Sequence, residues 1–359
     1  MKLILTDEQK DLSASVRAFL ADISPMARVR EIAESAESYD PAVWRRMSGE
    51  LGLTGLAIPE AYGGAGFGMS ELAVVLEELG AALTPAPFFA SAVLAAGVLV
   101  QLGDESAAKE YLPGIASGSV IATFAEGTLH SRAADDGSYL LTGTAPLVLN
   151  GLDAGLILVV ADSPAAVYAV PSDAPDLVRT PLTTLDLTRP QARLEFAGTP
   201  ARLIGPLDAT SALARTMDLA SVALAAEQLG GLRRCLSTIV EYAKLRVQFG
   251  RFVGSFQGVK HKLADMHCTL EQAESIVRYA AWAADFAPDE LPVAATLAQS
   301  FVGPAYFAVA RDHLLLHGGI GFTWEHDAHL YYKRAKSAEL LLGPPRHHRA
   351  LLAQRLGLR

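Results

Sequence analysis

The chain has 359 residues, an apolar content of 51% and a formal net charge of −9 at neutral pH. This length is enough for two or three domains with a large core, and the composition is typical of a packed globular protein. An acidic chain without a basic stripe argues against nucleic-acid binding. Two cysteines, Cys235 and Cys268, exclude a disulfide scaffold. We also expect no metal site.

The ends and the apolar runs of the chain bear on its location. Residues 1–7 lack the apolar core and cleavage site of a signal peptide. The apolar run 88–102 is flanked by proline and glycine and is too short to cross a bilayer. These features predict a cytoplasmic protein with no membrane span. An acidic chain offers no general attraction for an anionic cofactor, so such a cofactor needs a local basic patch.

The first third of the chain has helical patterns. Thr6 and Gln9 fit a capping box, with Thr6 as N-cap and Gln9 at N3. Pro41 suits the first turn of a second helix. A glycine-rich loop is expected over 52–68. The expected helices are 6–21, 41–51, 69–83, 88–102 and 105–115.

The pattern changes at Ser119. Short apolar segments separated by turn residues follow, and this spacing predicts antiparallel strands of a small barrel or sandwich. Helical periodicity resumes at Leu207 and lasts to the end of the chain. The expected strands are 121–124, 139–142, 147–149, 155–161, 166–170 and 189–196, and the expected later helices are 208–245, 258–286, 295–316 and 328–341.

The order of helices, strands and helices indicates an α+β fold with segregated domains. We expect an N-terminal helical domain over 1–118, a β-barrel or sandwich domain over 119–206, and a C-terminal four-helix-bundle domain over 207–359. The C-terminal helices carry more apolar surface than one four-helix core buries. This surplus predicts an oligomer, at least a dimer.

The loop between the two longest helical runs has an unusual composition. It reads RVQFGRFVGSFQ from Arg246 to Gln257, with two glycines, three aromatic residues, two arginines and two amides. One interpretation is a capped turn whose arginine covers the last helical carbonyls. The other is a site for an anion and a ring, with Arg246 on phosphate and Phe249 and Gln257 on a cofactor.

Two motifs resemble segments of the acyl-CoA dehydrogenase family. The loop is similar to that family's RxxFG…FQ segment, and HGGIGF at 317–322 is similar to its HGGxGF/Y segment about 70 residues later. The resemblance implies the family's architecture: an N-terminal α-domain, a middle antiparallel β-domain and a C-terminal four-helix bundle. It also implies FAD as cofactor, an acyl-CoA substrate, and electron-transfer flavoprotein or a similar acceptor.

The resemblance assigns the adenine half of a FAD site that two chains share. Leu315 departs from the family, which usually has glutamine two residues before the HGG segment. Glycine at the HGG segment permits close approach of the backbone to a cofactor. The residues implied as cofactor-binding are Arg246, Gln248, Phe249, Val253, Phe256, Gln257, Gly318 and Gly319.

The flavin-ring half of the family site is poorly matched. The family's VTEPxxGSD segment corresponds to FAEGTLH, where Ala125 replaces the threonine and the GSD is missing. In the next segment, Leu147 and Leu149 stand where the family has tryptophan and threonine. The strand is recognisable, but its flavin-binding side chains are missing.

Neither family position for the catalytic base holds a carboxylate. Leu342 occupies the commoner position, and Ala220 occupies the alternative one. Glu227 lies two helical turns beyond Ala220 in an apolar helix, where burial raises a carboxyl pKa. It is a weak candidate for a displaced base, and a structural carboxylate paired with an arginine is the competing interpretation.

Two polar clusters allow two interpretations each. Residues 324–329, WEHDAH, are compatible with a catalytic cluster or with helix capping and subunit contacts. Residues 346–349, RHHR, follow two prolines at a helix start. Basic residues there are unfavourable for the helix dipole, which suggests an anion partner such as a pyrophosphate, or an exposed basic turn.

These observations predict an FAD-dependent acyl-CoA dehydrogenase that works as one subunit of an assembly. The family includes heteromeric α2β2 enzymes in actinobacterial steroid side-chain degradation, and this sequence resembles the subunit type that lacks the base and completes the FAD site of its partner. One alternative is a self-sufficient flavoenzyme with a displaced base that acts on acyl-CoA or on a carrier-bound acyl group. Another is a non-catalytic CoA-binding or scaffold homologue without flavin. The expected oligomer is a homo- or hetero-oligomer, a dimer or an α2β2 tetramer.

Overall fold

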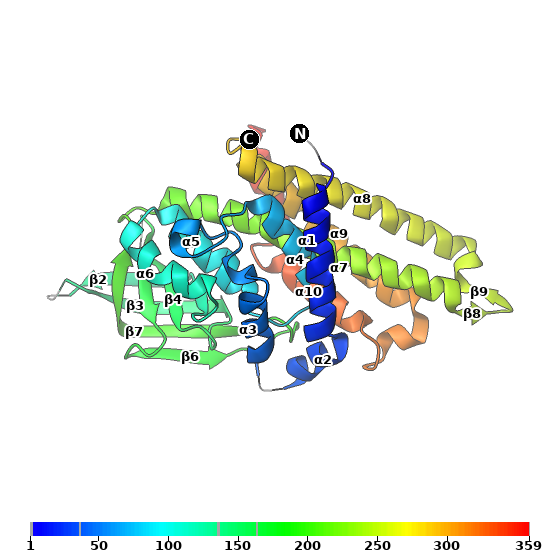
Figure 1. Cartoon of the computed structure of the whole chain (residues 1–359), viewed down its shortest axis with the longest axis horizontal. Helices are drawn as coiled ribbons and strands as arrows, with labels where there is room; N and C mark the ends of the chain where they lie inside the picture. Colours follow the sequence, from blue (N-terminus) through cyan, green and yellow to red (C-terminus); the bar gives the residue numbers. More distant parts are fainter. Residues whose placement is uncertain (1–2, 36, 135–136, 163, 359) are drawn as a thin grey trace. The chain divides into compact units, whose positions relative to one another are not determined.

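The structure is a computed structural model that describes residues 3–35, 37–134, 137–162 and 164–358. Helices come first, strands follow, and helices close the chain (Figure 1). This order confirms the expected α+β fold. Contacts divide the chain into two compact units. The helical unit comprises Met1–Val29, Met69–Thr84 and Ser221–Arg359, and the sheet unit comprises Arg30–Gly68 and Pro85–Ala220.

These contacts place Met1–Val29 and Met69–Thr84 in the same unit as the C-terminal helices. The division at residues 118 and 206 stays a prediction about domains in chain order. Five helices, α7 to α11, follow the sheet in the described chain, one more than expected. Helix α9 packs against α8, α10 and α11. The helical unit contains α1 (Asp7–Ile23), α4 (Met69–Ala82), most of α7 (Thr210–Leu245), α8 (Gln257–Phe286), α9 (Leu291–Leu316), the 3-10 turn η5 (Gly318–Phe322), α10 (Ala328–Leu340) and α11 (Pro345–Arg355).

One helix start in this unit is set by a local signal, and another is capped by a residue distant in the sequence. The capping box of α1 is confirmed: Gln9 N–H donates to Thr6 Oγ1 at 3.2 Å, and Thr6 N–H donates to Gln9 Oε1 at 3.1 Å. The start of α4 is capped instead from α8, where Asp285 accepts from the N–H groups of Met69 and Ser70 at 2.7 and 2.9 Å. A carboxylate there satisfies two orphan donors of the first turn.

Two glycines let α4 and α7 cross at close range. A Cβ added to Gly80 would lie 2.0 Å from the Glu227 carbonyl oxygen, and one added to Gly230 would lie 1.8 Å from that of Glu77. Any larger residue would force the helices apart. The crossing places two glutamates, Glu77 and Glu227, inside the helical unit.

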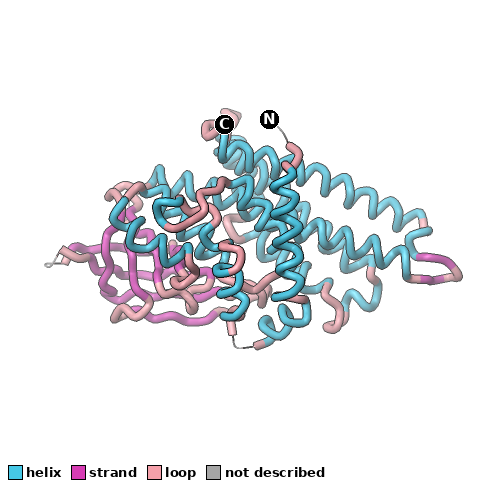
Figure 2. Tube along the Cα trace, viewed as in Figure 1, coloured by secondary structure: helices cyan, strands magenta, loops and turns pink. Residues whose placement is uncertain are grey.

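The sheet unit is built around one sheet, which Figure 2 shows in magenta. Its strand order is β1-β4-β5-β7-β3-β2, and β6 also pairs with β7. The strands are β1 (Ala122–Ala125), β2 (Thr128–Ala133), β3 (Tyr139–Leu149), β4 (Leu156–Ala161), β5 (Ala166–Pro171), β6 (Leu177–Pro181) and β7 (Gln191–Ile204). Its helices are α3 (Pro41–Gly49), α5 (Ala96–Leu102) and α6 (Glu105–Ala116), with the short turns η1 (Leu53–Gly55) and η2 (Glu60–Tyr62) and the π-helix η3 (Phe89–Ala95). Helix α2 (Met26–Glu34) joins the two units.

The sheet departs from the expected strands in three ways. The segments 139–142 and 147–149 form one strand, because the register shift between Ala145 and Val148 accommodates Pro146 without ending the pairing with β7. Strands β2 and β6 and helix α2 were not expected, and the sequence of β2, TLHSRA, is largely polar. The pairing is not wholly antiparallel, because β1 runs parallel to β4.

Among the residues that the structure describes, one helix is long and apolar enough to cross a membrane by length and composition alone. It is α9, and 56% of its most apolar window is buried inside the structure. The core helix of a soluble protein passes the same test, so α9 is weak evidence for a membrane span.

Candidate functional site

The loop between α7 and α8 is a small hairpin. Strand β8 (Val247–Gln248) pairs with β9 (Arg251–Phe252), followed by the 3-10 turn η4 (Val253–Ser255). Figure 1 shows this hairpin joining the two long helices. The Val253 N–H donates to the Arg246 carbonyl oxygen at 2.8 Å and closes its base. The sequence did not predict this pairing.

The hairpin tip combines two residues in the left-handed region. Phe249 has φ 53° and Gly250 has φ 76°. This pair suits a tight hairpin turn, but it is unusual for a phenylalanine. The Phe249 side chain is 92% exposed. A large apolar ring held in this position suggests a contact outside the chain.

Two side chains of the loop pack on the Phe256 ring. The Arg251 guanidinium lies over the Phe256 ring, 3.9 Å from its centroid. Phe249 meets the same ring edge-on at 6.2 Å. Gln257 Nε2 lies 2.8 Å from His261 Nε2. Within the described part of the chain, no carboxylate forms an ion pair with Arg246, which is exposed. The loop thus presents an aromatic pair and a guanidinium to the surroundings.

One contact links the end of α7, just before the hairpin, to the HGGIGF segment within the helical unit. The Tyr242 hydroxyl donates to the His317 carbonyl oxygen at 3.2 Å, and the two rings lie 4.5 Å apart. Tyr242 is four residues before Arg246 on the last turn of α7. Gly318 and Gly319 are exposed, and a Cβ added to either meets no described atom within 4 Å. The backbone after His317 is therefore open to a ligand.

A histidine cluster supports this segment from inside. His317 lies 4.6 Å from His313 and 4.3 Å from His326, measured between ring centroids. His313 Nε2 lies 3.2 Å from Thr238 Oγ1. Burial lowers the pKa of His313 to about 3, and His317 and His326 add to the effect. This cluster was not expected from the sequence, although the four-residue spacing of His313 and His317 places both on one helix face.

The family positions for the base hold hydrocarbon. Ala220 is buried on α7 and Leu342 is half-buried after α10. Glu227 is buried, and Arg334 Nη1 donates to its Oε1 at 2.7 Å. Arg334 is itself buried. The interpretation of Glu227 as a structural carboxylate paired with an arginine is thus supported, while its role as a base stays untested.

The positions expected to face a flavin ring lie in the sheet unit. Ala125 and Leu149 are buried, and Leu147 is exposed. None of the three side chains can donate a hydrogen bond. The side chains at these three positions therefore offer no hydrogen bond to a flavin ring.

The two polar clusters contain partly buried members. His326 Nδ1 accepts from the Ala328 N–H at 3.1 Å, which caps the start of α10. Trp324 is exposed, and the Lys333 ammonium lies 4.4 Å from its ring centroid. In the basic turn, His348 is buried, and burial lowers its pKa to about 4. Its neighbours Arg346, His347 and Arg349 are exposed.

Comparisons with known proteins identify the family. Residues 6–119 match the acyl-CoA dehydrogenase N-terminal domain, and residues 210–357 match the C-terminal domain. The chain belongs to the acyl-CoA dehydrogenase family, whose members are FAD-dependent oxidoreductases. The fold, the RVQFGRFVGSFQ loop at 246–257 and the HGGIGF segment at 317–322 agree with this assignment.

The similar proteins include mycobacterial members of the family. The acyl-CoA dehydrogenase IpdE2 of Mycobacterium tuberculosis is 35% identical over 340 residues, covering 95% of this chain and 94% of that relative. FadE34 of the same organism is 35% identical over 352 residues, covering 96% of this chain but 47% of FadE34. A chain of the M. tuberculosis ChsE4–ChsE5 complex matches with a TM-score of 0.92 and 31% identity over all of both chains.

Proposed function

We propose that this chain is the base-lacking subunit of a heteromeric FAD-dependent acyl-CoA dehydrogenase. In this assignment its hairpin and glycine segment complete the adenine side of a FAD site whose ring pocket and catalytic base belong to a partner subunit. The bound FAD would accept the β-hydrogen of the acyl chain as hydride, and electron-transfer flavoprotein or a similar acceptor would reoxidise it.

The base positions carry this proposal. Abstraction of the α-proton needs an acceptor within hydrogen-bond reach of that proton. Leu342 and Ala220 cannot accept a proton, and the weak candidate Glu227 is paired with Arg334. A carboxylate whose oxygen is engaged by a buried guanidinium is already used as one half of a buried ion pair.

The hairpin supports the part of the proposal that concerns FAD. Arg246 suits a diphosphate because its guanidinium is planar and always charged. Phe249 and Phe256 offer ring faces, and the open backbone at Gly318 and Gly319 allows close approach. These groups face outward in the described chain, as expected of groups that meet a cofactor shared with another subunit.

The relatives support a paired arrangement. A chain of the ChsE4–ChsE5 complex has the same fold over its full length. FadE34 is about twice as long as the region that it shares with this chain, so a second segment of similar size is joined to that region. We infer an α2β2 assembly or a dimer with another acyl-CoA dehydrogenase subunit.

Purification with and without a partner tests the proposal. The chain is expressed alone and together with a homologous subunit that has the family carboxylate, and flavin absorbance and acyl-CoA-dependent reduction of an artificial acceptor are measured. We expect a colourless, inactive chain alone and a yellow, active complex. A yellow and active chain alone would support a displaced base. A chain that stays colourless with every partner would support a scaffold role.

A further inference from the structure

The last turn of α7 supports both sequence motifs, the loop 246–257 and the HGGIGF segment 317–322. Tyr242 stands on this turn, and its carbonyl oxygen accepts from the Arg246 N–H at 2.8 Å. The Tyr242 hydroxyl donates to the His317 carbonyl oxygen at 3.2 Å, and the two rings lie 4.5 Å apart. One side chain of α7 therefore fixes the backbone immediately before Gly318.

The base of the hairpin packs on the same turn. A Cβ added to Gly254 of η4 would lie 2.8 Å from the Ala243 carbonyl oxygen, so the backbone of η4 lies directly against α7, beside Tyr242. The Val253 N–H also donates to the Arg246 carbonyl oxygen at 2.8 Å. The hairpin and the HGGIGF segment are therefore each anchored to one helical turn, and that turn sets their relative position.

The HGGIGF segment is fixed near both ends and open between them. Its first residue is the one that Tyr242 holds. Toward its other end, Gly321 is buried and has no room for a Cβ, because the Leu314 carbonyl oxygen lies there. Between these points, a Cβ added to Gly318 or Gly319 meets no described atom within 4 Å. A segment held in this way loses little further freedom when it binds a ligand.

The hydrogen bond to His317 also sets the direction of a backbone donor. A trans peptide is planar, and its C=O and N–H point in opposite directions. Because the His317 carbonyl oxygen points to the Tyr242 hydroxyl, the Gly318 N–H is directed away from Tyr242. Gly318 is exposed and has φ 67°, a conformation that favours glycine. An N–H held in this way suits an oxygen of a diphosphate.

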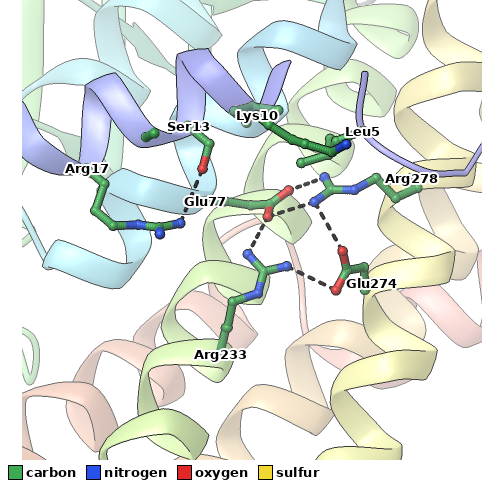
Figure 3. Close-up of a pocket in the computed structure, with 10 residues that line it drawn as sticks. Leu5, Lys10, Ser13, Arg17, Glu77, Arg233, Glu274 and Arg278 are labelled. Carbon is green, nitrogen blue, oxygen red and sulfur yellow. Dashed lines mark hydrogen bonds and ion pairs between the residues drawn. The ribbon is translucent and has the colours of Figure 1, made fainter. Parts of the chain in front are cut away.

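Helix α7 is itself held firmly before this turn. Arg233 of α7 donates to Glu77 of α4 at 2.7 Å and pairs with Glu274 of α8 at 3.2 Å. Figure 3 shows Arg233 reaching both carboxylates at a cavity that the three residues help to line. Closer to the last turn, Thr238 Oγ1 lies 3.2 Å from His313 Nε2 of α9. The turn thus stands on a helix tied to three others, as precise positioning requires.

We propose that Tyr242 is a positioning residue for FAD. It acts through the backbone of Gly318 and Gly319, which it holds in the orientation that meets the cofactor, and it couples this backbone to Arg246 on the same turn. The inference rests on the proposed function, because it takes the adenine side of FAD as the group that the two motifs bind. In this role Tyr242 changes the affinity for the cofactor and leaves the chemical step alone.

Flavin titrations of the assembled complex test this role. The chain is combined with a homologous subunit that has the family carboxylate, the flavin is removed, and FAD or FMN is added back while flavin fluorescence is recorded. Tyr242→Phe keeps the ring against His317 and removes the hydroxyl, so we expect about fivefold weaker FAD binding, as for the loss of one neutral hydrogen bond. Binding of FMN, which has no adenine half, should not change. Tyr242→Leu also removes the ring and should weaken FAD binding further.

Matched measurements separate positioning from folding. Tyr279→Phe removes the same group from another half-buried tyrosine of the helical unit, whose hydroxyl donates to Glu290 at 2.6 Å, and it should leave FAD binding unchanged. Turnover of the Tyr242→Phe complex at saturating FAD should stay within about twofold of wild type, because an interaction that only binds the cofactor does not change the chemical step. Melting temperatures of the flavin-free complexes control for folding.

Two results would overturn this inference and leave the proposed function standing. The first is wild-type affinity for FAD in Tyr242→Phe, because the hydroxyl would then position nothing. The second is equal weakening of FAD and FMN binding, because a general loosening of the complex would then explain the loss. A wild-type complex that binds no FAD would instead overturn the proposed function, and the role of Tyr242 with it.

Discussion

Two regions of the helical unit use arginine in opposite ways. Inside the unit, Glu77 holds Arg278 and Arg233, and Glu227 holds Arg334. At the hairpin, no carboxylate in the described chain forms an ion pair with Arg246, which lies beside an exposed Phe249. Charge that is paired within the chain serves the fold. Charge and aromatic surface that the chain leaves open are available to a cofactor or another subunit.

The largest expected effect is the loss of a buried partner. Arg334→Met removes the cation beside buried Glu227, and we expect stability to fall by about 3–5 kcal/mol, the usual cost of breaking a buried pair. Urea unfolding of the purified chain measures it. The double variant Arg334→Met/Glu227→Leu should regain much of the loss. If Arg334→Met alone had the free energy of unfolding of the wild type, the pair would add nothing to the stability of the fold.

The second largest effect is expected at the exposed Arg246. Arg246→Ala should weaken FAD retention by about 1.5–3 kcal/mol, the range for a hydrogen bond to a charged group, without changing unfolding. Flavin absorbance after gel filtration of the assembled complex measures retention. Lys244→Ala is the control, because Lys244 is exposed near the same loop and pairs with Glu241. Equal flavin content in both variants would remove Arg246 from the site.

These two regions also differ in how well the sequence predicted them. The Arg-Phe-Gln spacing identified the loop, because such a cluster is unusual in a simple turn. The partner of Glu227 was expected to be an arginine, but Arg334 is 107 residues away and no local pattern names it. The same holds for Asp285, which caps α4 from another helix. Helix ends with local signals, such as Thr6, were predicted closely.

The sheet shows the same limit. Short, continuous apolar runs located β4 and β5. Strand β2 was missed because its polar sequence forms a strand only through its pairing with β3. Pro146 divided one strand into two expected ones, since a sequence does not reveal that a register shift will accommodate the proline. Long-range pairing decided these elements.

The third effect is a pH dependence from the histidine cluster. Burial lowers the pKa of His313 from 6.5 to about 3 in the folded chain. The unfolded chain therefore binds the proton first, so stability is full above pH 6.5 and falls as the pH drops from 6.5 toward 3. We expect a loss of about 2 kcal/mol at pH 5 from this group alone.

Unfolding by urea at pH 7 and pH 5 measures this dependence. His313→Gln keeps a group that can contact Thr238 and should reduce the loss between the two pH values. His267→Gln is the control, because His267 is exposed. An unchanged loss in the His313 variant would assign the pH dependence to other groups.

The smallest expected effect decides whether the buried pair also takes part in catalysis. If a partner supplies the base, Glu227 only pairs with Arg334, and Glu227→Gln should leave turnover of the assembled complex within a few-fold of wild type. Glutamine keeps the shape of the side chain and removes its charge, so stability is measured in parallel. Loss of an essential base would instead lower the rate by about 10²- to 10⁴-fold.

The assay is acyl-CoA-dependent reduction of an artificial acceptor, with Glu241→Gln as the exposed control. A thousandfold loss of turnover in a Glu227→Gln complex that stays folded at the assay temperature and keeps its flavin content would make Glu227 a displaced base. The buried region would then serve chemistry as well as the fold, and the chain would supply its own base.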